Sequence, residues 1–155
     1  MNRLGGCAVL ALALVAAGCA ALPAGPGGPG ADDLAGTWRI ASYLGADDRA
    51  VAPLAGTGPF LSFGTDGRLG GTAGCNSFGA DYRAGNGRLS VGPVVTTLMY
   101  CEAPGVMDQE ARVLSLLSLA EEFRLDGDAL VLLDAGGRAV MTLARAPAPP
   151  PTGSA

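Results

Sequence analysis

The stretch FLSFGTDGRL, residues 60–69, decides the fold class, because it places two apolar segments on either side of a turn. Its centre, residues 64–67, is rich in residues that tolerate positive φ, as a tight hairpin turn requires. Residues 60–63 and 68–69 are therefore predicted to be antiparallel strands joined as a hairpin. The same pattern predicts a second hairpin downstream, with its turn at residues 126–128.

Further strands are indicated by short apolar segments that lie between turn residues. Residues 38–43 alternate with period two, which allows one face of the strand to be buried. Gly92 and Pro93 separate two middle strands, because proline cannot donate a hydrogen bond to a β-ladder. The remaining strands are predicted at residues 89–91, 94–99, 122–125, 129–133 and 139–143.

Residues 106–120 differ from the rest, because their apolar side chains recur at helical spacing. The stripe consists of Val106, Val113, Leu117 and Ala120, with Leu114 and Leu116 beside it. Asp108, Gln109 and Arg112 are expected on the opposite side, facing solvent. The sequence thus predicts an α+β fold that is mainly β, a curled, barrel-like antiparallel sheet of about eight short strands with one helix packed on it.

The N-terminal segment has the composition of an export signal. Arg3 supplies a positive charge, and residues 4–17 form an apolar run without a charged side chain. This run of about 14 residues is too short for a bilayer, which takes roughly 20, but it suits a signal peptide. It ends in AAGC at residues 16–19, which resembles a lipobox. We therefore expect residues 1–18 to be removed and Cys19 to carry the acyl chains of a lipoprotein.

Two other outcomes remain open for this segment. An ordinary secretory signal would be cut slightly later, after Ala21 or Ala24, and an uncleaved segment would stay as an anchor. If Cys19 is acylated, Ala20 follows it, and no Asp stands there to retain the protein at an inner membrane. The expected location is then the periplasmic face of the outer membrane in a Gram-negative cell, and otherwise the outer face of the cell membrane.

Segments rich in Pro and Gly flank the predicted domain. Residues 19–33 are expected to be the lipidated Cys19 and a tether, because the sequence LPAGPGGPGADD cannot build a core. Residues 146–155, with the sequence APAPPPTGSA, are predicted to be a disordered tail. A single domain is thus expected at residues 34–145.

Three motifs within this domain are informative together. The first is GCNSF at residues 74–78, followed by Tyr82; the second is TTLMYC at residues 96–101; the third is MDQE at residues 107–110. In this order and spacing, and with LAGTW at residues 34–38, they resemble the META domain, the family of the HslJ-like heat-shock lipoproteins. The resemblance covers about 110 residues, nearly the whole predicted domain.

The resemblance implies a compact, barrel-like α+β module that is often attached to a lipoprotein signal. It implies a family linked to the cell envelope and stress tolerance, with no established catalytic activity or ligand. The family motif is kept in this chain, and we expect a structural role for its residues. These are Gly74, Cys75, Asn76, Phe78, Tyr82, Thr97, Met99, Cys101 and Glu110.

Cys75 and Cys101 are the thiols that remain after export. Cys7 lies in the segment to be removed, and Cys19 would be blocked by lipid. An exported protein with two remaining thiols favours a disulfide. Two buried thiols, or a redox or metal role, are the alternatives. We expect neither a metal nor a cofactor, since the chain has no His and no CxxC motif.

The other motif residues each have two interpretations. Asn76 could be an amide that faces a ligand, but such a residue more often holds a turn through its own side chain. Phe78, Tyr82 and Trp38 are expected in the core rather than on a binding platform. Glu110, near the start of the helix, is expected to satisfy backbone donors there.

Composition argues against an enzyme. The chain has no His and no Lys, so the usual bases for a Ser, Cys or Thr nucleophile are missing, Thr96 and Thr97 included. The 14 acidic residues permit a paired-carboxylate glycosidase by number alone, but they fall in turns, helix faces, strand ends and the tether. A net charge of −4 without a basic patch excludes nucleic-acid binding and electrostatic binding to anionic lipid.

The favoured hypothesis is a monomeric, non-enzymatic envelope module that is held to the membrane by its N-terminal lipid. Its role would be structural or protective, exerted on envelope proteins through its surface. A small-ligand carrier or sensor, with a cavity between the sheet and the helix, is the alternative. An inhibitor of a secreted hydrolase is a second alternative.

Overall fold

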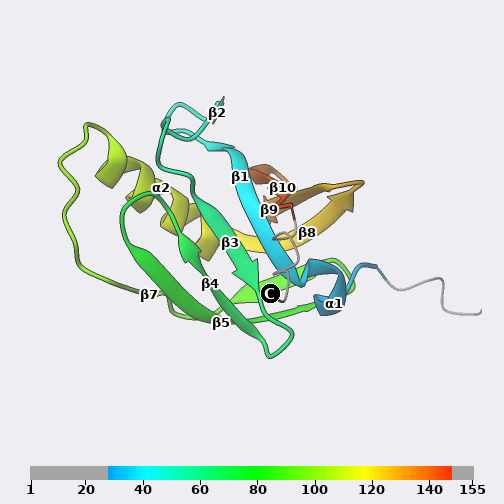
Figure 1. The fold of residues 1–155 in the computed structure, drawn as a ribbon. Coiled ribbons are helices and arrows are strands. Elements are labelled where there is room, and N and C mark those ends of the chain that lie inside the picture. Colours follow the sequence, from blue (N-terminus) through cyan, green and yellow to red (C-terminus); the bar gives the residue numbers. More distant parts are fainter. Residues whose placement is uncertain (1–27, 148–155) are drawn as a thin grey trace, which may run out of the picture.

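The computed structural model describes residues 28–147 of the 155-residue chain (Figure 1). Two helices and ten strands follow one another as α1 (Ala31–Leu34), β1 (Gly36–Leu44), β2 (Ala50–Val51), β3 (Phe60–Phe63), β4 (Arg68–Thr72), β5 (Ser77–Gly85), β6 (Arg88–Val91), β7 (Val95–Thr96), α2 (Val106–Leu119), β8 (Ala120–Asp126), β9 (Ala129–Asp134) and β10 (Ala139–Arg145). Within these residues, neither helix has the length and apolar character needed to cross a membrane.

Eight of the strands close into a barrel. Neighbours pair in the order β1-β3-β4-β5-β6-β8-β9-β10, and β10 pairs back with β1, so the ring has no free edge. All of these pairings are antiparallel. The two short strands lie outside the ring, where β2 extends β1 and β7 extends β5. The predicted fold class, a mainly β, barrel-like sheet with one main helix, is confirmed.

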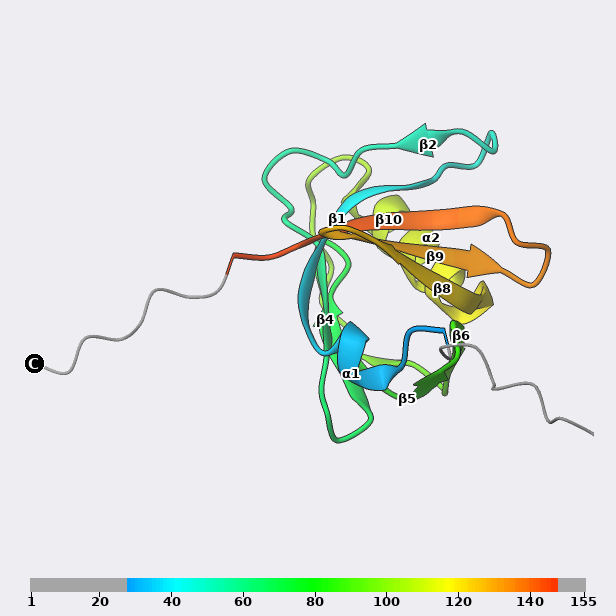
Figure 2. The same ribbon diagram turned by 90° about the vertical axis from the view of Figure 1, so that its right-hand side faces the viewer.

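The barrel is filled by apolar side chains from the strands and from α2. Figure 2 shows α2 behind β8, β9 and β10 in that view, and the α2 side chains Val113, Leu116 and Leu117 belong to the same core cluster as the strand residues. Burying each large apolar side chain stabilises the fold by roughly 1.5–3 kcal/mol. The largest fully buried side chains are Trp38, Phe63, Leu34, Leu61, Leu69, Leu116, Leu117, Leu130, Leu132, Met141, Leu143 and Val113.

Where β1 meets β10, the barrel is closed around Trp38. The indole Nε1 donates a hydrogen bond to the carbonyl oxygen of Leu34 at 2.7 Å. The guanidinium carbon of Arg145 lies 4.1 Å from the indole ring centroid, a cation–π arrangement. We call Leu34, Trp38 and Arg145 the Trp38 end.

The Trp38 end extends into the segment that we expected to be a free tether. Residues 31–34 form α1, where the Asp33 carboxylate accepts a hydrogen bond from Gly30 N at 2.8 Å. Leu34 is fully buried, and the carbonyl of Pro29 accepts a bond from Gly87 N at 2.9 Å. The ordered domain therefore begins before the expected boundary at residue 34. Residues 29–33 are held to it by the Asp33–Gly30 and Gly87–Pro29 hydrogen bonds.

The expected apolar stripe of α2 is buried, but its polar side differs from the prediction. Val113 and Leu117 are fully buried, as predicted. Gln109 was expected in solvent and is instead buried, with 3% of its surface exposed. Arg112 is half-buried and donates to the carbonyls of Leu44 and Gly45 at 2.7 and 2.9 Å. The prediction for these two residues was wrong. The spacing of apolar residues gives no information about hydrogen-bond partners that lie far away in the sequence.

Two strands also differ from the prediction. β5, residues 77–85, was not predicted, although it is one of the eight strands of the barrel. The strand predicted at residues 94–99 is shorter, since β7 ends at Thr96. The reason is that Met99 N donates to the side chain of Asn76 rather than to a neighbouring strand.

Candidate functional site

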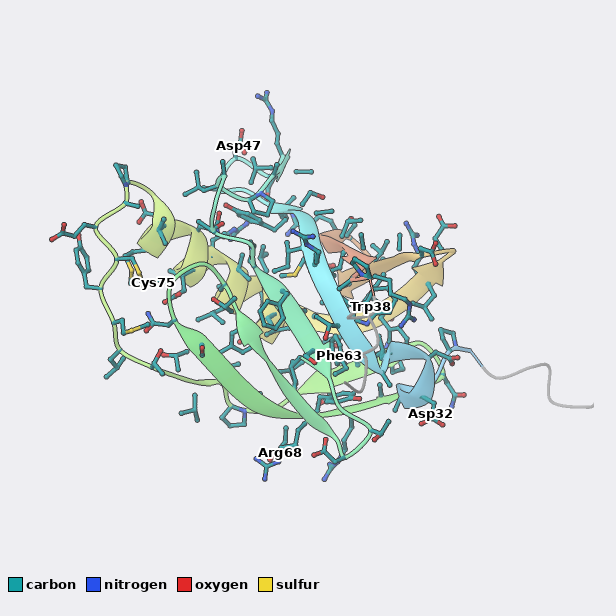
Figure 3. The ribbon with its side chains drawn as sticks, in the orientation of Figure 1. Asp32, Trp38, Asp47, Phe63, Arg68 and Cys75 are labelled. Carbon is teal, nitrogen blue, oxygen red and sulfur yellow. A yellow bond between two sulfur atoms is a disulfide. The ribbon has the colours of Figure 1, made fainter. Side chains whose placement is uncertain are left out.

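The predicted motif residues other than Phe78 and Tyr82 meet at one place, where three segments come together. These segments are the β4–β5 connection with Cys75 and Asn76, the segment between β7 and α2, and the beginning of α2. Figure 3 shows Cys75 at the opposite end of the molecule from Asp32 in α1. We call this group the motif clasp, defined as Cys75, Asn76, Thr97, Met99, Cys101, Gln109 and Glu110.

Asn76 lies at the centre of the motif clasp and uses every polar atom of its amide. Its Nδ2 donates to the carbonyl oxygen of Met99 at 3.0 Å and to Glu110 Oε1 at 2.7 Å. Its Oδ1 accepts from Thr97 Oγ1 and from Met99 N, both at 2.7 Å. These four bonds complete the capacity of an amide side chain. The amide is 4% exposed and faces the protein rather than an open ligand site.

Glu110 is a buried carboxylate that fixes the β4–β5 connection to α2. Its Oε2 accepts hydrogen bonds from the backbone N–H groups of Cys75, at 3.0 Å, and Asn76. Charge-assisted bonds of this kind are about twice as strong as neutral ones. The side chain satisfies backbone donors, but they belong to residues 34 and 35 positions away and not to its own helix.

Cys75 and Cys101 form a disulfide, with their Cα atoms 6.0 Å apart. The predicted disulfide is thus confirmed. The alternatives were two buried free thiols and a redox or metal role for the two cysteines. The disulfide joins the β4–β5 connection to the segment between β7 and α2. The bridge and Asn76 therefore hold residues 97–101 from both ends.

Gln109 belongs to this site, although the sequence placed it in solvent. Its Oε1 accepts from Leu54 N at 2.7 Å, and its Nε2 donates to Ala73 O at 2.9 Å and Thr57 Oγ1 at 3.1 Å. A Cβ atom added to Gly74 would lie 2.9 Å from that Nε2, and Gly74 has a φ of +145°. The glycine is therefore required both by the backbone and by the amide.

The residues between the two anchors expose their apolar side chains. The exposed fractions are 73% for Val95, 96% for Leu98, 56% for Met99 and 78% for Tyr100. We call residues 95–100 the display loop. It contains four of the six large hydrophobic side chains that are exposed in the described part of the chain. These residues were predicted as strand and motif positions, and their exposed apolar surface was not predicted.

Comparison with known families gives a direct match. The model of the META domain matches residues 32–147. The chain belongs to the META domain family. The resemblance inferred from the motifs is thus confirmed, and the matched span agrees with the ordered barrel.

Solved structures share the fold of this META domain. A protein from Burkholderia xenovorans, determined by NMR, is 23% identical with a TM-score of 0.62, and the match covers 85% of this chain and 99% of that one. A DUF4847 family protein from Bacteroides vulgatus is 15% identical with a TM-score of 0.51, covering 72% and 92%. At these identities the likeness concerns the fold alone. No curated protein matches the sequence.

The aromatic motif residues of the META domain lie in the core and not in the motif clasp. Phe78 and Tyr82 are buried on β5, and the Tyr82 ring packs edge-on against Phe63, with centroids 5.0 Å apart. The Tyr82 hydroxyl donates to the carbonyl of Gly64 at 2.8 Å. Burial, followed by the charges of Asp66 and Asp32, raises the pKa of Tyr82. Cys19, the predicted lipidation site, lies outside the described residues.

The polar groups of the motif clasp hold its three chain segments together. Its buried amides and carboxylate are engaged by protein groups, and among residues 28–147 no buried side-chain nitrogen or oxygen lacks a partner. Glu110, with 6% of its surface exposed, is the buried carboxylate of this site. What the site offers to the outside is the apolar surface of the display loop.

Proposed function

We propose that this META domain protein is a non-enzymatic lipoprotein of the cell envelope, with a structural or protective role. The observation that carries the proposal is the N-terminal sequence, in which a charge-free apolar run ends in AAGC at residues 16–19. Acylation at Cys19 would hold the barrel at a membrane through a Pro/Gly-rich tether. The barrel would then act on neighbouring envelope proteins through its surface.

Two features of the folded part support this assignment. The Cys75–Cys101 disulfide fits an oxidising compartment outside the cytoplasm. The polar groups that resemble a site, Asn76 and Glu110, are engaged in holding segments together. A chain without His or Lys also lacks the usual proton carriers for catalysis.

The small-ligand carrier is the weaker alternative. It requires a cavity between the sheet and α2, but the side chains at that position belong to one packed core, including Val113, Leu116 and Leu117. Two hollows are open to solvent: one of about 500 Å³ lined by β5, β6 and the junction of α2 with β8, and one of about 470 Å³ lined by β4, β5 and β7. No structural feature specifically favours the third candidate, a hydrolase inhibitor.

The proposal is tested by the intact mass of the mature protein from membrane and soluble fractions of the producing cells. We expect a membrane-bound species that begins at Cys19 and carries added lipid. A Cys19→Ser chain is the matched control and should lose the lipid mass. A soluble wild-type species that begins downstream of Cys19 would contradict the anchor and favour a freely diffusing protein.

A further inference from the structure

The display loop has the properties of an open strand edge. β7 pairs with β5 on one side, and no strand among the described residues pairs with its other side. Thr97 N donates to Ser77 O at 3.0 Å and Met99 N donates to Asn76 Oδ1 at 2.7 Å, so the backbone N–H groups of Thr97 and Met99 face β5 and the residue before it. Since alternate residues of an antiparallel strand direct these groups to opposite edges, those of Thr96 and Leu98 face outward.

This edge lacks the features by which proteins protect open strands. Lys side chains, inward-pointing charges and prolines usually block such edges. Residues 94–101 contain no charged residue and no proline, and Pro93 comes before the exposed segment. The outward backbone groups are instead combined with the exposed side chains of Leu98 and Tyr100. An extended polypeptide would satisfy the backbone groups and cover these side chains at the same time.

The position of the tether favours a polypeptide, and not the anchoring membrane, as the binding partner of the display loop. The described chain begins at Gly28, next to α1, and Figure 3 places Cys75 at the far end from Asp32 of α1. The nine residues from Cys19 to Gly28 span at most about 30 Å. An anchor attached at that end leaves the motif clasp at the opposite end of the molecule. The loop also lacks the cations that anionic lipid attracts.

We infer that the open edge of the display loop binds an extended, apolar segment of another polypeptide by β-strand addition. The partner strand lies along Thr96 and Leu98, bonds to their outward N–H and C=O groups, and covers Leu98 and Tyr100. The motif clasp pre-forms this edge, so that little ordering is required on binding. The inference rests on the proposed envelope role and names the class of partner, which is an unfolded or extended segment of an exported protein.

The test uses the mature protein in nanodiscs and a permanently unfolded probe, reduced and carboxymethylated α-lactalbumin. Native α-lactalbumin, which is folded, is the control. Hydrogen exchange read by mass spectrometry should slow about tenfold at the outward amides of Thr96 and Leu98 with the unfolded probe only. Variants then separate the backbone edge from the apolar side chain.

Leu98→Pro removes an outward N–H and should weaken probe binding about tenfold, whereas Leu98→Ala keeps this group and should weaken binding about threefold. Leu119→Ala, at another exposed apolar residue, should leave binding unchanged. An unchanged urea midpoint shows that each variant is folded. Equal losses for the Pro and Ala variants would overturn strand addition.

Three other outcomes would also overturn the inference. One is protection of residues 96–98 by the bilayer without the probe, which would assign the loop to lipid. Another is protection that grows with protein concentration, which would assign it to a second copy of the chain. The third is no protection at all. Because these measurements leave Cys19 intact, their failure is distinguishable from a missing lipid, which intact mass detects.

Discussion

The Trp38 end and the motif clasp hold the barrel by opposite means. At the Trp38 end, Leu34 and Trp38 are fully buried among apolar side chains, and the indole N–H donates to the carbonyl of Leu34. At the motif clasp, buried polar groups hold a loop whose apolar side chains lie in solvent. The buried polar or charged residues of the described part, Asn76, Gln109 and Glu110, are all found there.

This difference shows that the exposed apolar surface is not a failure of packing. Hydrophobic association alone would draw Leu98 and Tyr100 toward the core. Directional bonds from Asn76 and the Cys75–Cys101 bridge hold the backbone where these side chains stay outside. The Trp38 end therefore stabilises the fold, whereas the motif clasp holds an apolar surface in solvent.

The largest expected effect is at the Trp38 end. Trp38→Ala should lower the free energy of unfolding by about 3–5 kcal/mol, because it leaves a cavity in the core. It also removes the hydrogen bond to Leu34 and the stacking with Arg145. Urea unfolding followed by circular dichroism measures the loss. Arg39→Ala, at the exposed neighbouring position, should change stability by less than about 0.5 kcal/mol, and similar losses for both would refute the contrast.

Removal of the disulfide should have the next largest effect. Replacement of Cys75 and Cys101 by Ser opens a loop with a sequence separation of 26. The chain-entropy model then gives a loss of about 3.5 kcal/mol. We expect hydrogen exchange to accelerate more at residues 97–101 than in β9. Such a difference would show that the disulfide stabilises this segment more than the domain as a whole. Uniform acceleration would contradict the local role of the bridge.

Glu110→Gln should cost about 2 kcal/mol. Whichever way the new amide is turned, its NH₂ group meets a donor, either Asn76 Nδ2 or the backbone N–H groups of Cys75 and Asn76. The matched control is Asp108→Asn, an exposed carboxylate on the same helix, which should cost little. Equal urea midpoints for the Gln variant and the wild type would show that the Glu110 carboxylate does not stabilise the contact between α2 and the β4–β5 connection.

The smallest expected effect is in the β9–β10 turn, which belongs to neither the Trp38 end nor the motif clasp. Hydrogen bonds from the backbone and side chain of Arg138 lower the pKa of Asp134 below its usual 3.8. A carboxyl with a lowered pKa stabilises the folded state above pH 3.8, and this contribution is lost as the pH falls through the folded value. Asp134→Asn should therefore be slightly less stable than wild type at pH 7, and the difference should vanish in acid. Asp126→Asn, measured in the same urea titrations, is the control.

Much of the fold could be predicted, because local patterns decide it. The hairpin at residues 60–69 and the stripe of α2 depend on turn chemistry and spacing that adjacent residues carry. β5 was missed because small residues interrupt its apolar pattern, although Phe78 and Tyr82 lie on its buried face. Its signal is the period-two series Phe78, Ala80, Tyr82 and Ala84, in which alanine is too weak a marker of burial.

The site was predicted only in part, because its contacts join distant segments. Motif resemblance selected Asn76 and Glu110, but not the bonds between them across 34 residues. Gln109 was assigned to solvent because its partners, such as Leu54 and Ala73, lie far away in sequence. The display loop gave no signal, since an apolar run such as VVTTLM is as typical of a buried strand as of an exposed edge.

The central claim is that the motif clasp holds the display loop in a fixed conformation. The most direct test is the backbone ¹⁵N order parameters of Leu98, Met99 and Tyr100 in the mature protein. We predict values near those of the barrel strands, about 0.85, which should fall at these residues alone in Asn76→Ala. Values below about 0.6 in the wild type would mean a flexible loop and would contradict the account.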